Sequence, residues 1–212
     1  MFNTSLLGVG VQVEALDIAG TYAFTPVQHS DDRGTFCEWY RSDVVAAATG
    51  RPMPLAQANH SVSSRGVVRA IHYADVPPGQ AKFVYCPRGA VLDVIVDIRV
   101  GSPTFGSWTS VRLDDVDRRG VYLAEGLGHG FAALTEGASV TYLCSTAYNP
   151  GREHSVHALD PAIGIDWAVP APALAARDAA APSLAEAEAA GLLPRWSDCA
   201  AWYAESGQTL VR

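Results

Sequence analysis

The chain has 212 residues, of which 49% are hydrophobic and 17% are charged, which is enough apolar material for a folded core. Its formal net charge is −7 at pH 7, and this disfavours nucleic acid as a partner because a groove that follows a phosphate backbone needs a surplus of basic side chains. We expect a single domain over residues 1–212, in which residues 168–212 form a C-terminal wrapping segment with helices.

The first expected elements are a hairpin and a short helix. The run Asp31-Asp32-Arg33-Gly34 is typical of a hairpin turn, and we place Glu38 on the strand that follows it. A short helix is expected over Ser42–Ala48, with Gly50 ending it.

The middle of the chain is a succession of short apolar runs separated by Gly, Pro and Asp. The expected strands are Gly66–Tyr73, Lys82–Pro87, Leu92–Ile98, Ser107–Leu113, Gly120–Leu123, Gly130–Leu134 and Ser139–Ser145. In the clearest of them, the apolar residues Leu92, Val94, Val96 and Ile98 fall on one face at a period of two. Many short strands without long helices between them predict a mainly β fold, a sandwich or jelly-roll barrel, and argue against a Rossmann-type α/β fold.

Short helices are expected again near the C-terminus. The stretch Ala168–Pro182 is rich in Ala and Pro and is expected to wrap the surface. Ser183-Leu184-Ala185-Glu186 matches a capping box before an Ala-rich run that Gly191 would stop. A last helix is expected to start at Ser197 or Asp198.

His72 is a candidate general base, because the apolar or aromatic residue on each side would desolvate its imidazole and favour the neutral form that a base needs. From the residues alone, a core histidine bonded to a backbone group is the stronger interpretation. Arg69 and His72 would point to opposite faces of a regular strand, unless a bulge or strand twist brings them together.

A glycine-flanked histidine, His129, lies in the run Gly126–Phe131, where a turn can present amides and an imidazole to an anion. An ordinary strand-to-strand turn explains the same spacing, and a phosphate-binding G-x-G-x-x-G loop is excluded by the lack of a strand–turn–helix context. Tyr142 and Tyr148 are further candidates for the site, but tyrosines on barrel strands are usually core or interface aromatics. Asp178 is also a candidate, and its ordinary interpretation is a solvated loop carboxylate.

No metal site and no redox cofactor are expected. The six histidines include no H-x-H pair, and the four cysteines include no C-x-x-C spacing, as is typical of free thiols in a reducing compartment. The first 13 residues contain no basic stretch and only a short apolar run. We therefore expect no signal peptide, no membrane span and a cytoplasmic location.

Several ordered motifs between about Gly20 and Trp196 resemble the dTDP-4-dehydrorhamnose 3,5-epimerase family, especially its actinobacterial members. The motifs are Asp32-Arg33-Gly34-x-Phe36-x-Glu38, Gln57-x-Asn59-x-Ser61-x-Ser63, Arg69-x-x-His72, Gln80-x-Lys82, Asp93-x-x-x-Asp97-x-Arg99, Gly101–Gly106, Gly126-x-x-His129-Gly130-Phe131, Tyr148-x-Pro150 and Asp160-Pro161 before Ile165-x-Trp167. The resemblance implies a cupin-like jelly roll with short peripheral helices that works as a homodimer without a cofactor.

The resemblance also implies residue roles. His72 corresponds to the general base, Asp178 to its orienting partner, Tyr142 to the acid on the opposite sugar face, and Lys82 to the cation that neutralises the enolate oxygen. The implied substrate-binding residues are Arg69 and His129 at the diphosphate, Gln57 and Asn59 at the sugar, Arg33 and Glu38 at the nucleotide, and Tyr148.

The implied reaction is epimerisation of a dTDP-4-keto-6-deoxyhexose at C3 and C5 through an enolate, an isomerase activity of deoxysugar and rhamnose biosynthesis. Three alternatives remain open: a single-site epimerase of an antibiotic deoxysugar pathway, a non-catalytic jelly roll that binds nucleotide sugars, and a metal-dependent cupin oxygenase or isomerase. Ala70 and Ala147 depart from the family pattern, and we expect them near the sugar, where the extra methyl group of Ala70 would crowd the pocket.

Overall fold

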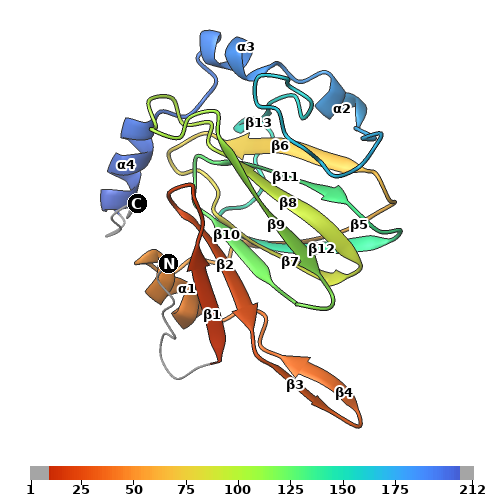
Figure 1. Ribbon diagram of the computed structural model, residues 1–212. Helices are drawn as coiled ribbons and strands as arrows, with labels where there is room; N and C mark the ends of the chain where they lie inside the picture. Colours follow the sequence, from red (N-terminus) through yellow and green to blue (C-terminus); the bar gives the residue numbers. More distant parts are fainter. Residues whose placement is uncertain (1–9, 206–212) are drawn as a thin grey trace.

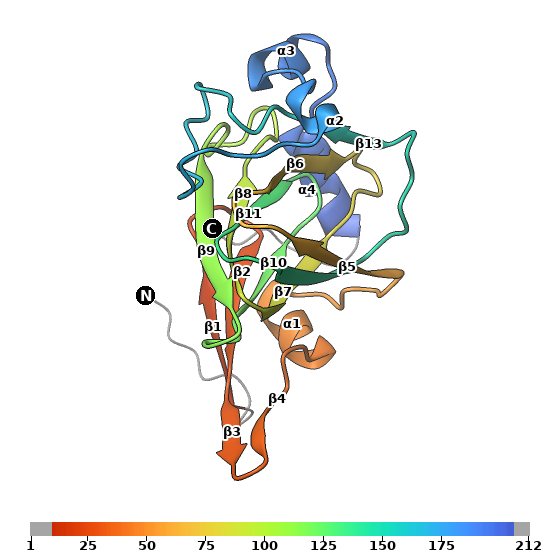
Figure 2. The same cartoon turned by 90° about the vertical axis from the view of Figure 1, so that its right-hand side faces the viewer.

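The computed structural model describes residues 10–205, which form two antiparallel sheets packed face to face. The six-stranded sheet has the order β1 (Val11–Ala15), β2 (Thr21–Pro26), β10 (Gly120–Leu123), β7 (Lys82–Arg88), β12 (Ala138–Cys144) and β5 (Gln57–Ser63). The five-stranded sheet has the order β13 (Glu153–Ser155), β6 (Val68–Ala74), β11 (Gly128–Ala133), β8 (Ala90–Val96) and β9 (Trp108–Asp114). Figures 1 and 2 show the two sheets from directions 90° apart. The mainly β jelly-roll prediction is confirmed.

A separate hairpin of β3 (Gln28–Asp31) and β4 (Gly34–Cys37) projects away from the sheets (Figure 1). Its turn lies where the Asp31–Gly34 motif predicts it, with Asp31 opposite Gly34 and Gly34 at a positive φ of 125°. Glu38 was expected on the second strand, but β4 ends at Cys37, so Glu38 lies just beyond it.

Four helices cover the edges of the sheets in the described part of the chain. They are α1 (Ser42–Thr49), α2 (Ala176–Ala179), α3 (Leu184–Ala189) and α4 (Trp196–Glu205). Gly50 ends α1 in the left-handed conformation, and Ser183 and Glu186 form the predicted capping box of α3. The last helix begins at Trp196, one or two residues before the predicted start at Ser197 or Asp198.

The apolar residues form two buried clusters on opposite sides of the five-stranded sheet. Ile95 on β8 joins the cluster between the sheets, together with Val84 and Val140 of the six-stranded sheet. Val94 and Val96, which point the other way, join a cluster with Trp167 and with Leu184 and Leu193 of the C-terminal segment. The C-terminal segment therefore covers the outer face of the five-stranded sheet, which otherwise would expose this apolar surface.

No helix within residues 10–205 is long and apolar enough to cross a membrane. The sequence-based expectations about a signal peptide concern mainly residues 1–9, which lie outside the described residues.

Candidate active site

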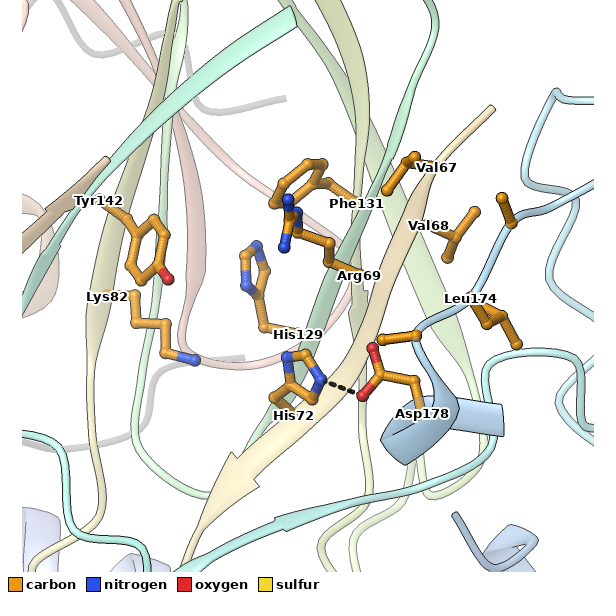
Figure 3. Close-up of a pocket in the computed structure, with 12 residues that line it drawn as sticks. Val67, Val68, Arg69, His72, Lys82, His129, Phe131, Tyr142, Leu174 and Asp178 are labelled. Carbon is orange, nitrogen blue, oxygen red and sulfur yellow. Dashed lines mark hydrogen bonds and ion pairs between the residues drawn. The ribbon is translucent and has the colours of Figure 1, made fainter. Parts of the chain in front are cut away.

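A cavity of about 400 Å³ lies between the two sheets and contains six of the eleven predicted site residues. They are Arg69, His72, Lys82, His129, Tyr142 and Asp178. Arg69, His72 and His129 come from β6 and β11 of the five-stranded sheet, whereas Lys82 and Tyr142 come from β7 and β12 of the six-stranded sheet. Figure 3 shows the two groups facing each other across the cavity.

His72 is held by a carboxylate from the C-terminal segment. Its Nε2 lies 2.8 Å from Oδ1 of Asp178 on α2, a residue 106 positions away in the sequence. Burial alone would raise the pKa of Asp178, but hydrogen bonds from His72 and the Ala70 amide outweigh it and hold this pKa below its ordinary value. An ionised Asp178 accepts a hydrogen bond from Nε2–H of His72, which leaves Nδ1 with a free lone pair turned toward the cavity (Figure 3).

Arg69 and His72 share the cavity wall because β6 contains a register irregularity. His129 pairs with His72, whereas Phe131, two residues further along β11, pairs with Arg69, three residues back along β6. The extra residue on β6 restores the same orientation to both side chains. A bulge that brings Arg69 and His72 to the same face of the sheet is therefore present.

Lys82 and Tyr142 provide hydrogen-bond donors from the opposite wall. Lys82 is 9% exposed, and burial lowers the pKa of its ammonium group, while the negative fields of Cys144, Glu153 and Asp93 oppose that change. Burial raises the pKa of Tyr142, so its hydroxyl carries a proton at neutral pH. This wall can therefore supply a positive charge from Lys82 and a proton from the Tyr142 hydroxyl.

The remaining two cationic candidates are each fixed by a neighbour. Nε2 of His129 lies 2.8 Å from Oδ2 of the buried Asp93 on β8. Nε of Arg69 donates to Oγ of Ser63 at 3.1 Å. Both side chains are oriented before any anion arrives, which lowers the entropic cost of binding one.

Three predicted binding residues form a hydrogen-bonded row beside the cavity but do not line it. Nε2 of Gln57 donates to Oδ1 of Asn59 at 2.9 Å, and the Tyr148 amide donates to Oε1 of Gln57 at 2.8 Å. Asn59 is paired directly with Tyr142 across the β5–β12 ladder. Their predicted roles in substrate binding stay predictions.

Arg33 and Glu38 lie away from this cavity. Arg33 is exposed on the β3–β4 hairpin and pairs with Asp31 at 2.5 Å. Glu38 lies 3.6 Å from Arg41. Neither belongs to the cavity of its own chain.

The expectation that Ala70 crowds the pocket is wrong. Ala70 is fully buried in the outer apolar cluster, and a Cβ on Gly130 would lie 2.1 Å from the Ala70 Cβ. The methyl group thus fills the space beside Gly130 and faces away from the cavity. Ala147 is exposed and does not line the cavity either.

Asp93, Phe131 and the loop at residues 173–175 also contribute to the site, although the sequence motifs indicate no role for them. Composition gives an additional signal for Lys82, which is the only lysine in the whole chain, whereas 14 of the 15 Lys and Arg residues are arginine.

Within residues 10–205, no group of three or more His, Cys, Asp or Glu side chains is arranged to hold a metal ion.

Comparison with known proteins gives consistent similarity over most of the chain. The family model described as dTDP-4-dehydrorhamnose 3,5-epimerase matches residues 15–186. The chain is 56% identical over 191 residues to a dTDP-4-dehydrorhamnose 3-epimerase of Streptomyces niveus, covering 90% of this chain and 92% of that protein. It is 54% identical over 197 residues to a dTDP-4-dehydrorhamnose 3,5-epimerase of Mycolicibacterium smegmatis, covering 92% and 97%.

The solved structure of the rmlC epimerase of Mycobacterium tuberculosis superimposes with a TM-score of 0.90 at 50% identity, covering 92% of this chain and 98% of that one. Fold, sequence and the matched family model agree over the strands that build the cavity. The chain belongs to the dTDP-4-dehydrorhamnose 3,5-epimerase family.

Proposed function

We propose that this protein is an isomerase that epimerises a dTDP-4-keto-6-deoxyhexose at C3 and C5, in the synthesis of an L-rhamnose-type sugar. The observation that carries the proposal is the placement of His72 and Tyr142 on opposite walls of one cavity, with Lys82 beside them. Inversion of a carbon centre requires a base on one face of the sugar and an acid on the other.

The reaction begins when Nδ1 of His72 removes the proton from a carbon next to the ketone. The electron pair of that C–H bond moves into the new C–C double bond, and the carbonyl oxygen gains negative charge. The ammonium group of the buried Lys82 stabilises this enolate. The Tyr142 hydroxyl then returns a proton from the opposite face, after which solvent reprotonates the phenolate and takes the proton from His72.

The diphosphate of the substrate is expected to bind between Arg69 and His129. Arg69 supplies the planar guanidinium group that suits phosphate oxygens, and Ser63 holds it in place. Asp93 fixes the ring of His129 through Nε2, so that Nδ1 is available as a donor when the imidazole is protonated. Binding at this end leaves the keto sugar near His72 and Lys82.

We also infer a homodimer in which the hairpin of one protomer reaches the nucleotide end of its partner's cavity. Arg33 and Phe36 are exposed on a projecting hairpin, with Phe36 66% exposed, and Arg33 lies outside the cavity of its own chain. An exposed arginine beside an exposed aromatic ring suits a nucleotide diphosphate.

Subunit mixing tests this arrangement. Arg33→Ala and His72→Ala homodimers should both be impaired at limiting substrate. Random exchange between them should restore about a quarter of the wild-type sites, because half the dimers are mixed and each has one intact site. Failure of mixing to restore activity, while the subunits exchange, would contradict the shared site.

The four cysteines are free thiols, which supports the inferred cytoplasmic location, since disulfides are rare in reducing compartments.

The test of the main proposal is solvent-proton exchange. The protein is incubated in heavy water with dTDP-4-keto-6-deoxyglucose, and deuterium at each sugar carbon is followed by NMR. Deuterium at C3 and C5 with a rhamno-configured product supports the proposal. His72→Ala should abolish exchange with little loss of dTDP binding, whereas His60→Ala, on an exposed part of β5, serves as the matched control.

A single-site epimerase is the second candidate. It is favoured by the 56% identity to a relative named as a 3-epimerase, which slightly exceeds the 54% identity to a relative named as a 3,5-epimerase. Deuterium mainly at one carbon would support this candidate. Intact binding without exchange at either carbon would instead indicate a non-catalytic nucleotide-sugar-binding protein.

A further inference from the structure

Glu153 lies on the cavity side of β13, next to the strand that carries His72. In the antiparallel pair of β13 and β6, Ser155 is opposite His72 and Glu153 is opposite Ala74. Residues two apart on a strand share a face, so Glu153 and Ser155 point to the same side as His72.

The residue between them shows the opposite orientation. His154 pairs with Tyr73, their rings lie 5.5 Å apart, and Tyr73 belongs to the apolar cluster on the outer face of the sheet. His154 also lies 2.8 Å from Asp75. Because His154 points outward, its neighbour Glu153 is directed inward.

The Glu153 carboxylate acts on both donors of the opposite wall. Its charge opposes the lowering of the Lys82 pKa that burial causes, and it adds to the raising of the Tyr142 pKa. Glu153 is half-buried, and no residue between 10 and 205 donates a hydrogen bond to its side-chain oxygens. Asp93, the other carboxylate that acts on Lys82, has Oδ2 bonded to His129, while its buried Oδ1 has no hydrogen-bond partner among the described residues.

The negative charge of Glu153 is important because of the other titratable groups around Lys82. The titratable or charged groups that face Lys82 or share its cavity are Cys144 and Tyr142 on β12, Asp93 on β8, His129 on β11, His72 and Arg69 on β6, and Asp178 on α2. Arg69 is positively charged, and each of the two histidines adds a positive charge whenever it holds a second proton, as His72 does after it has taken one from the substrate; positive charge nearby favours the neutral amine of Lys82. A carboxylate without its own cationic partner offsets that effect.

We propose that Glu153 is a positioning residue that keeps Lys82 as an ammonium group and Tyr142 as a protonated phenol. One carboxylate on β13 thereby maintains the proton on both donors of the six-stranded wall, as enolate stabilisation and proton return require. The roles of Lys82 and Tyr142 in this inference rest on the proposed function.

The single lysine of the chain allows a direct measurement. Protein labelled with [ε-¹³C]lysine has one labelled side chain, whose chemical shift reports the titration of Lys82 without substrate. In Glu153→Gln, the titration midpoint should move to lower pH, and Glu153→Asp should retain part of the wild-type value. Glu188→Gln removes the same charge from an exposed position on α3 and should leave the midpoint unchanged.

Kinetics then separate a positioning role from direct substrate binding. The alkaline limb of the exchange rate should move to lower pH in Glu153→Gln, while KM and dTDP affinity stay near the wild-type values. A displacement of one pH unit would reduce the active ammonium fraction on that limb about tenfold.

An unchanged Lys82 midpoint in folded Glu153→Gln would overturn the inference. A raised KM without a change in the Lys82 titration would also overturn it, because Glu153 would then be a substrate ligand. The titration is independent of catalysis, so failure of the wild-type protein to exchange C3 or C5 would refute the proposed function and leave this measurement valid.

Discussion

Replacing Asp178 by Asn tests the central pair of the proposed mechanism. The substitution keeps the size of the side chain but removes the charge that fixes the proton on Nε2 of His72. The Asn amide group can donate to Nε2 instead, which would place the imidazole proton on Nδ1. His72 would then have no free lone pair facing the substrate.

The structure sets the expected size of this effect. The 2.8 Å contact lies in a shielded position, because the Asp178 side chain is only 7% exposed. A hydrogen bond to a charged group contributes about 1.5–3 kcal/mol, which corresponds to about 10- to 150-fold in rate. Loss of the correct tautomer adds to this, and general-base catalysis as a whole contributes about 10²- to 10⁴-fold. We therefore expect kcat to fall by about 10²- to 10⁴-fold.

The assay is the initial rate of deuterium incorporation at C3 and C5 with saturating substrate at pH 7. Binding of dTDP, measured by calorimetry, should change little. Asp166→Asn, an exposed change just before the C-terminal segment, is the control. If Asp178→Asn retains exchange within a factor of ten of the wild type, the His72–Asp178 pair is not the base.

Three further outcomes follow from the contacts. Tyr142→Phe should retain dTDP binding but lose rhamno-configured product by NMR, because it removes the returning proton. Gly130→Ala should lower the free energy of unfolding by about 1–3 kcal/mol through overpacking, and Ala70→Gly should recover only part of it, since a Cβ at Gly130 also lies 2.8 Å from the Arg69 carbonyl oxygen. Arg99→Ala should cost about 3–5 kcal/mol in chemical denaturation because it leaves the buried Asp97 unpaired. Although burial would raise the pKa of Asp97, its hydrogen bonds lower it, so this stabilisation is present above about pH 4 and is lost as the pH falls through the lower native pKa.

The sequence predicted strands well where the alternation is apolar. Gly120–Leu123 was predicted with its observed bounds, and Lys82–Pro87 differs from β7 by one residue. Strand β5 is not predicted by apolar alternation, because its inward positions are the polar Gln57, Asn59, Ser61 and Ser63. These residues flank a cavity rather than a dry core, so the usual pattern of apolar residues inside is reversed.

The site was harder to predict than the fold, because its parts are joined only by tertiary structure. From the residues alone, Asp178 was a solvated loop carboxylate, and only the resemblance connected it with His72. Packing of the C-terminal segment on the five-stranded sheet brings the two together. Likewise, strict alternation separates Arg69 from His72, and the bulge that unites them is defined by pairing with β11.

The position of Ala70 shows that other residues must determine whether one or two carbon centres of the sugar are inverted. Its methyl group packs beside Gly130 on the outer side of β6, so it cannot contact the sugar. His72 is fixed by Asp178, and C3 and C5 lie on opposite sides of the carbonyl carbon. The sugar ring must therefore sit so that the hydrogens on both carbons can reach the same base. The side chains that limit this placement are those lining the cavity, including Phe131 and Leu174, and the number of inverted centres follows from the space that they leave around the ring.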